Sequence, residues 1–301
     1  MNASYNKLTT IGKLESLLNL INLNLSNNKI EKMEDCFGSL QKLSKLNLNY
    51  NKIKELPPSF QKLDSLKILK LKKNDLKEIN SLSKLSNLEK LDVAGNEIKI
   101  ANLQFPKNLK SFDSSSSNLF SQEKLFSTRL FSCFYLKELD LKANKLKKIP
   151  KPIYTLSYLT TLNLSNNRIQ YLHHNISNLI RLNYFDISHN RIKVLTVGVT
   201  KLHSLSTFLF HDNRLSSPPL SVILKGTSSI LEWLNLLLIG SHSDPYLSSF
   251  LKKFLFNNKQ NYFPKIKHFI KSYHTVFNRS FSSLSAQCIF FKKQIFFNFI
   301  F

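Results

Sequence analysis

An eleven-residue segment that recurs along most of the chain constrains the fold more than any other feature. It begins at Leu20 as LINLNLSNNKI, at Leu43 as LSKLNLNYNKI and at Leu66 as LKILKLKKNDL. Further clear copies begin at Leu88, Leu136, Leu159, Leu182 and Leu205, and a degraded copy, LKSFDSSSSNL, begins at Leu109. All follow the pattern LxxLxLxxNxL. Repetition at a period of about 20–50 residues indicates a solenoid or another repeat array.

The ninth position of the pattern tests whether the copies keep one register. Its residues are Asn28, Asn51, Asn74, Asn96, Ser117, Asn144, Asn167, Asn190 and Asn213. Their spacings are 23, 23, 22, 21, 27, 23, 23 and 23 residues. Spacings this regular do not arise by chance, so we predict nine consecutive repeats.

Each repeat is expected to contain one short strand, because the fourth and sixth positions are apolar and flank a single residue. Side chains two residues apart in a strand point to the same face. One repeat cannot bury that face alone, but stacked neighbours can. Each Leu buried in this way contributes about 1.5–3 kcal/mol.

The pattern resembles that of the leucine-rich repeat family. This resemblance implies an α/β solenoid, a horseshoe of nine repeats with a parallel β-sheet on its concave face and a helical cap at its C-terminal end. It also implies that the ninth-position Asn side chains form a structural ladder, whose amides bond backbone groups of adjacent turns. Loss of such an amide would leave buried polar groups unpaired at about 1–3 kcal/mol each. Ser117 is shorter than Asn, so we expect the ladder to be weakest there.

Three further segments indicate which type of leucine-rich repeat protein the chain resembles. LPPSF at residues 56–60 and IPKPI at residues 149–153 resemble the intracellular, Ras-group type of leucine-rich repeat protein. ILKGTSSILEWL at residues 223–234 resembles the C-terminal cap of intracellular proteins of the leucine-rich repeat-containing protein 40 type. Within it, SSILEWLNLLL has the apolar spacing of an amphipathic helix.

We expect four segments along the chain. They are an N-terminal flank at 1–15, the repeat array at 16–219, a capping helix at 220–238 and a tail at 239–301.

The array contains an insertion at 120–135, interpreted either as a longer convex segment or as a docking bulge or joint. The tail holds 13 of the 24 Phe residues. It is either poorly ordered sequence from a mispredicted gene end, or a helical tail that contacts a membrane or a partner.

The cysteines and the N-terminal sequence indicate the cellular compartment in which the protein is located. Cys36, Cys133 and Cys288 are widely spaced and form no CxxC pair, so neither a disulfide framework nor a cysteine zinc site is indicated. The N-terminus lacks a cationic start followed by an apolar run, and no stretch reaches the ~18 apolar residues of a membrane span. We expect a cytoplasmic protein, with the nucleus as an alternative, and no secretion.

Enzymatic motifs are not found. The sequence contains no GxxxxGK[ST], GxSxG or HExxH. Asp92, Asp113 and Asp140 share one slot of neighbouring repeats, where close carboxylates can shift one another's pKa, but Asp is common in this slot of the family. His173 and His174 are adjacent and poorly placed to share a metal ion. We therefore expect a non-enzymatic protein with no catalytic residue, no cofactor and no metal site.

The third, fifth and seventh positions are expected to face outward on the concave face, with the eighth beside them. The residues that we predict to contact a partner there are Lys45, Tyr50, Lys70, Lys72, Asp92, Asp113, Asp140, Tyr184, Asp186, His189 and His211. This face is basic in its N-terminal third and acidic beyond it. Such polarity would orient a partner with complementary patches.

The formal net charge of +24 is expected to lie mainly elsewhere. Six of the nine tenth-position residues are basic, and stacking would align them along one rim, which we call the basic rim. These nine residues are Lys29, Lys52, Asp75, Glu97, Asn118, Lys145, Arg168, Arg191 and Arg214. The rim is either a solvated edge or a surface for an acidic protein, phosphoinositide head groups or nucleic acid. Nucleic acid is the less favoured partner, because the repeats lack stacking aromatics and a groove-entering helix.

The sequence therefore predicts a monomeric intracellular scaffold or adaptor that binds protein partners through its concave face. The Ras-group resemblance implies small-GTPase or kinase signalling, or phosphatase targeting, as partner classes. Two alternatives remain: a peripheral membrane or nucleic-acid binder that uses the basic rim and tail, or a truncated, non-functional gene model.

Overall fold

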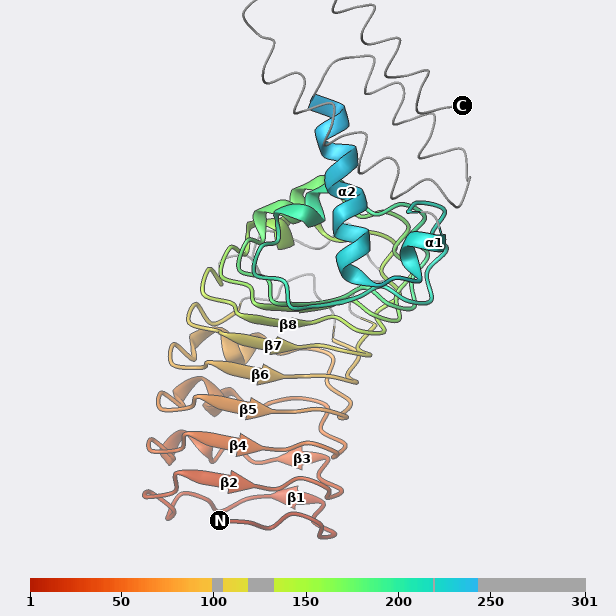
Figure 1. Cartoon of the computed structure of the whole chain (residues 1–301). Helices are drawn as coiled ribbons and strands as arrows, with labels where there is room; N and C mark the ends of the chain where they lie inside the picture. The colour runs from red at the N-terminus through yellow and green to blue at the C-terminus, as the bar shows by residue number, and fades with distance from the viewer. Residues whose placement is uncertain (99–104, 119–132, 219, 243–301) are drawn as a thin grey trace, which may run out of the picture. The chain divides into compact units, whose positions relative to one another are not determined.

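The computed structural model describes residues 1–98, 105–118, 133–218 and 220–242 (Figure 1). The chain divides into two compact units, Met1–Ser217 and a second unit that begins at Pro218. The expected insertion at 120–135 lies outside the described residues except for residues 133–135. The expected tail lies outside them except for residues 239–242.

Nine of the described strands form one parallel sheet in the first unit. They are β2 (Asn22–Asn24), β4 (Lys45–Asn47), β5 (Ile68–Lys70), β6 (Lys90–Asp92), β7 (Ser111–Asp113), β8 (Glu138–Asp140), β9 (Thr161–Asn163), β10 (Tyr184–Asp186) and β11 (Thr207–Leu209). Strands consecutive in this list are neighbours in the sheet, and Figure 1 shows β2 and β4 to β8 stacked one above another. Equivalent repeat positions pair throughout, as Leu23 does with Leu46. The predicted solenoid of nine repeats with a parallel sheet is confirmed.

Short 3₁₀ helices lie on the return segments between strands. They are η1 (Phe37–Ser39), η2 (Pro58–Lys62), η3 (Asn80–Lys84), η6 (Lys151–Thr155), η7 (His174–Asn178) and η8 (Val197–Lys201). Proline occupies the first turn of η2 and of η6, where its fixed φ suits the helix and its missing N–H costs no bond. Phe37 and Phe60 are fully buried, with ring centroids 4.7 Å apart. The return segments therefore extend the core behind the sheet.

The ninth-position side chains bond the backbone of two consecutive turns. Asn51 Nδ2 donates to the carbonyl of Leu48 in its own repeat and to that of Leu25 in the preceding one, each at 3.0 Å. Its Oδ1 accepts from the N–H of Ile30 at 3.1 Å. Asn74, Asn96, Asn167, Asn190 and Asn213 make the same three kinds of bond. Buried amides thus satisfy backbone groups that water cannot reach.

The fifth repeat departs from the pattern at two positions. Ser117 Oγ still reaches the preceding repeat, where it donates to the carbonyl of Val93 at 3.2 Å. A hydroxyl has a single O–H donor, however, whereas the Asn amide has two N–H donors and a carbonyl acceptor. Ser114 stands at the sixth position, which is apolar in the other repeats, and its buried Oγ has no hydrogen-bond partner in the described structure. β7 nevertheless pairs in register with β6 and β8. Stacking from both sides therefore holds the degraded repeat in place.

The N-terminal residues pair with the first repeat. β1 (Thr10–Ile11) is parallel to β3 (Lys32–Met33). Asn28 Nδ2 donates to the carbonyl of Ala3 at 2.9 Å, and its Oδ1 accepts from the N–H of Leu8 at 3.1 Å. The backbone of Asn24 also bonds Met1 and Ala3. The exposed edge of β2 is thereby covered, which removes unpaired backbone groups from the start of the sheet.

The second unit contains two described helices, α1 (Leu220–Ile223) and α2 (Thr227–His242). Gly226 lies between them at φ +87°, a conformation that glycine adopts readily. Ile230, Trp233 and Leu234 of α2 are buried and follow the spacing expected for one helix face. Among the described residues, neither helix is both long enough and apolar enough to cross a membrane.

Candidate binding face of the sheet

Asp or Asn at the fifth position closes seven of the nine strands of the sheet with a local hydrogen bond, the exceptions being Lys70 and Leu209. Its Oδ1 accepts from the backbone N–H two residues later, at 3.1 Å for Asp92, 2.8 Å for Asp113 and 2.8 Å for Asp140. Asn24, Asn47, Asn163 and Asp186 accept in the same way. This turn explains why short side chains with an acceptor oxygen recur there. It also fixes the direction of the carboxylates.

Three carboxylates form a continuous row on the concave face. The register pairs Asp92 of β6 with Asp113 of β7, and Asp113 with Asp140 of β8. All three side chains are half-buried. Burial raises the pKa of Asp92 and of Asp140, and the negative charge of Asp113 raises both further. The row therefore concentrates negative charge at the centre of the sheet and costs stability at neutral pH.

Asp113→Asn is expected to stabilise the protein at pH 7 by at most about 1 kcal/mol, because water screens these partly exposed groups. Asn keeps the acceptor for the N–H of Ser115 and removes the charge next to both neighbours. Since the folded pKa values are raised, the cost of ionisation is absent at low pH and grows as pH rises through the raised pKa values. The gain, measured by thermal unfolding, should therefore shrink on acidification. Asp75→Asn, at an exposed carboxylate, is the control, and an equal effect in both variants would contradict repulsion within the row.

The basic part of the concave face lies on the preceding strands. Lys45 of β4 and Lys70 of β5 are exposed, and Lys72 just after β5 is half-buried. Lys72 and Lys70 both lower the pKa of Asp92, which opposes the effect of burial. Tyr50, in the turn after β4, is 47% exposed. Carboxylates thus first appear among these residues at β6, where Lys90 is also exposed.

The remaining predicted contact residues follow β9. Tyr184 of β10 is half-buried; burial raises its pKa, and the charges of Asp186 and Asp140 add to this effect. Asp186 is only 7% exposed, and its Oδ1 accepts from the N–H of Ser188 at 2.9 Å and from its hydroxyl at 2.6 Å. Its carboxylate is therefore committed to the turn and less accessible than the acidic row. His189 and His211 are exposed in the turns after β10 and β11, where they lie close to Asp212.

The seventh position differs from the outward orientation that we expected. Its side chain is buried in four repeats, at Ser26, Ala94, Ser165 and Ser188. In three of these the Ser hydroxyl donates to the fifth-position side chain of its own repeat. The buried residues at this position are all small, whereas the longer side chains of Lys72, Lys142 and His211 are accessible. The small size of these residues was the available sequence signal.

An exposed aromatic group beside the sheet was also missed. Tyr135 and Tyr158 occupy the residue just before successive repeats, with ring centroids 5.8 Å apart. The guanidinium of Arg181, at the same position of the next repeat, lies 4.4 Å from the centroid of Tyr158. Phe134 is 64% exposed next to them. Tyr, Phe and Arg are the residues that protein interfaces favour.

The tenth-position residues of the basic rim are all exposed. Lys52 forms an ion pair with Glu31 at 3.4 Å. Asp75, Glu97 and Asn118 separate Lys29 and Lys52 from the longer basic group at Lys145, Arg168, Arg191 and Arg214. The rim is therefore two basic patches rather than one continuous stripe.

Family models described as leucine rich repeat match residues 19–40, 41–98 and 134–192. No curated protein shows significant sequence similarity to this chain. The matched segments cover most of the array described above.

Several solved structures are similar to this chain. A TDR receptor is 22% identical, with a TM-score of 0.58 over 71% of this chain and 39% of its own. A chain of an octameric complex of Latrophilin 3, Unc5D and the leucine-rich repeat part of FLRT2 is 26% identical to this chain. Its TM-score is 0.57, and the match covers 65% of this chain and 62% of that chain. A leucine-rich repeat protein of Leptospira interrogans is 26% identical, with a TM-score of 0.46 over 70% and 66%. This chain spans less than two thirds of the length of each.

Proposed function

We propose that the protein is a non-enzymatic scaffold or adaptor that binds a protein partner on the concave face of its leucine-rich repeats. The observation that carries this proposal is the row of Asp92, Asp113 and Asp140 in register next to Lys70 and Lys72. The fold commonly serves as a protein-interaction scaffold, and the FLRT2 structure contains such a repeat in a complex with other proteins.

The energetics of the row support binding rather than stability. Burial and mutual repulsion raise the pKa of Asp92 and of Asp140, so ionised carboxylates at this site weaken the free protein. Asn satisfies the same turn at Asn24, Asn47 and Asn163 without that cost. Residues that lower stability are frequently retained for function. A partner that places basic groups over the row would relieve the repulsion on binding.

The polarity of the face favours one orientation of the partner. A partner with an acidic patch above Lys45 and Lys70 and a basic patch above Asp113 and Asp140 would be steered into that orientation. We further propose an intracellular, monomeric adaptor in small-GTPase, kinase or phosphatase signalling. The Pro-containing segments at 56–60 and 149–153 and the cap-like segment at 223–234 support this finer assignment.

The test is a charge reversal that leaves the net charge unchanged. Partners enriched on the full chain are identified, and the Kd of the purified partner is measured for Lys70→Glu/Asp140→Lys. The matched control, Lys145→Glu/Asp75→Lys, makes the same exchange at exposed tenth positions of the rim. We expect the concave variant to lose at least about tenfold in affinity and the control to bind normally, because complementary charges set specificity. Circular dichroism checks that both variants fold.

The basic rim provides the competing function, binding to a membrane surface or nucleic acid. Lys145, Arg168, Arg191 and Arg214 are exposed at equivalent positions of consecutive repeats, which favours an extended anionic ligand. Affinity that falls steeply with salt, fails in the rim variant and survives in the concave variant would replace our proposal with this one.

A further inference from the structure

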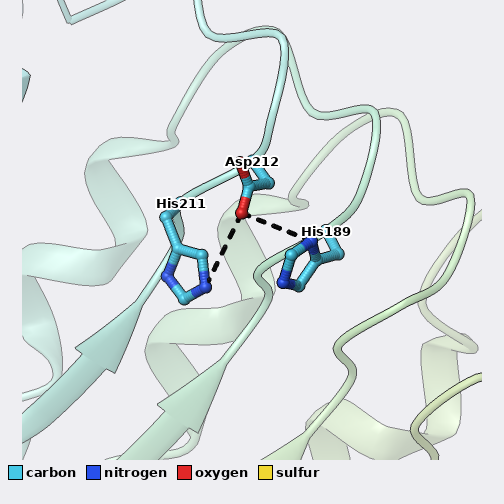
Figure 2. Close-up of side chains that lie close together, drawn as sticks. All are labelled: His189, His211 and Asp212. Carbon is cyan, nitrogen blue, oxygen red and sulfur yellow. Dashed lines mark ion pairs between the residues drawn. The ribbon is translucent and has the colours of Figure 1, made fainter.

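We propose that His189, His211 and Asp212 form a binding site for one divalent transition-metal ion, with Zn²⁺ as the best match. The three side chains come from the turns after β10 and β11, and Figure 2 shows them converging on one point. Their ligand atoms all lie within 4.8 Å of one another. This site is separate from the acidic row and does not depend on the proposed function.

The distances suit a single small cation. Asp212 Oδ2 lies 3.3 Å from His189 Nδ1 and 3.9 Å from His211 Nε2 (Figure 2). A tetrahedral Zn²⁺ with bonds of about 2.0–2.1 Å holds its ligand atoms about 3.3–3.4 Å apart. The first pair already has this separation, and the two imidazole nitrogens lie within 4.8 Å of each other. Rotation of the exposed His211 ring, which would bring its nitrogen closer to both other ligand atoms, is therefore needed on binding. The two imidazole rings lie edge to face, with centroids 5.1 Å apart.

The backbone that carries these ligands is fixed by the repeat. His189 and Asp212 both adopt left-handed conformations at φ 52°, and the ladder residues Asn190 and Asn213 follow them directly. The N–H of His189 donates to the carbonyl of His211 at 3.0 Å. Binding would therefore order only side-chain torsions, which keeps its entropic cost low.

The ligand set determines the class of metal. Two neutral imidazoles and one carboxylate suit Zn²⁺ and related transition metals rather than Ca²⁺ or Mg²⁺, which prefer oxygen ligands. Three protein ligands leave a fourth position open for water or for a side chain of a bound partner. The other described His pair, His173 and His174, lacks this arrangement, because His173 Nδ1 already accepts from the N–H of Asn175 at 3.2 Å.

The test measures Zn²⁺ binding to the full chain after removal of any affinity tag and of adventitious metal. The variants His189→Asn, His211→Ser and Asp212→Asn each introduce a residue that other repeats carry at the same position, so the turns should fold normally. His174→Asn, at an exposed His away from the site, is the matched control. Calorimetry gives the stoichiometry and Kd, and Co²⁺ substitution reports tetrahedral geometry through its visible absorption.

We expect one saturable site in the wild type and in the control, and a loss of at least about tenfold in affinity in each site variant, since each removes one ligand. Zn²⁺ should also raise the Tm of the wild type and not that of the site variants, because a ligand stabilises the state that binds it. Absence of saturable binding in the wild type would overturn the proposal. Equal affinity in the wild type and in the three site variants would overturn it as well.

Discussion

Asn167→Ala is expected to lower the free energy of unfolding by about 3 kcal/mol, because it leaves several buried polar groups without partners. The side-chain amide of Asn167 donates to the carbonyls of Leu141 and Leu164, each at 2.9 Å. Its oxygen accepts from the backbone N–H groups of Asn144 and Leu146, each at 3.0 Å. Alanine supplies none of these bonds, and the site is too enclosed for water to replace them all.

Denaturant unfolding followed by circular dichroism measures this loss as a shift of the midpoint. Asn178→Ala, at an exposed residue of η7, is the control and should change stability by no more than about 0.5 kcal/mol. A loss in Asn167→Ala no larger than in the control would show that the ladder contributes little to stability.

The sheet was predictable from the sequence because one short pattern defines every strand. The fourth-position residue is buried in each strand, and the repeat spacing alone sets which residues pair between neighbours. Even the fifth repeat, with Ser114 and Ser117 in place of Leu and Asn, follows the register of its neighbours. Stacking is a property of the whole array, so a weak copy takes the conformation of the strong ones.

The accessibility of single side chains was less predictable. Asp92 and Asp186 occupy the same position and make the same turn, yet Asp186 is buried with a Ser hydroxyl on its carboxylate and Asp92 is followed by Ala94. The leucine pattern fixes where a strand ends and not how the next two residues fill the turn. The Ser hydroxyl alone does not explain the burial of Asp186, because Asn24 and Asn163 accept the same bond and are half-buried.

The His–His–Asp group was missed for a different reason. His189 stands at the eighth position of its repeat and His211 at the seventh of the next, so the two do not belong to one column of the pattern. A comparison of equivalent positions between repeats therefore does not show that His189 and His211, which lie diagonally across neighbouring turns, are close to each other. His189 and Asp212 share the eighth position, and a comparison of the seventh position with the preceding eighth position would have added His211 to them.

Phe185→Ala is expected to destabilise the C-terminal repeats by about 3–5 kcal/mol, because it leaves a large cavity in the core. Phe185 is fully buried at the fourth position of β10, and its ring stacks on that of Phe208 in β11 at 5.5 Å between centroids. Phe185→Leu, which restores the residue most common at this position, should recover most of the loss, since it refills much of the volume.

The position of Phe185 near one end of the array makes the expected damage local. Each repeat contacts only its neighbours, so a weakened interface should release the repeats beyond it before the rest unfold. Hydrogen exchange should show early loss of protection at residues 182–217, while residues 43–76 keep theirs. Leu46→Ala, at the fourth position of β4, should produce the opposite pattern. Equal loss of protection along the whole array in both variants would mean that the repeats unfold as one cooperative unit, and the nearest-neighbour account of its stability would then be wrong.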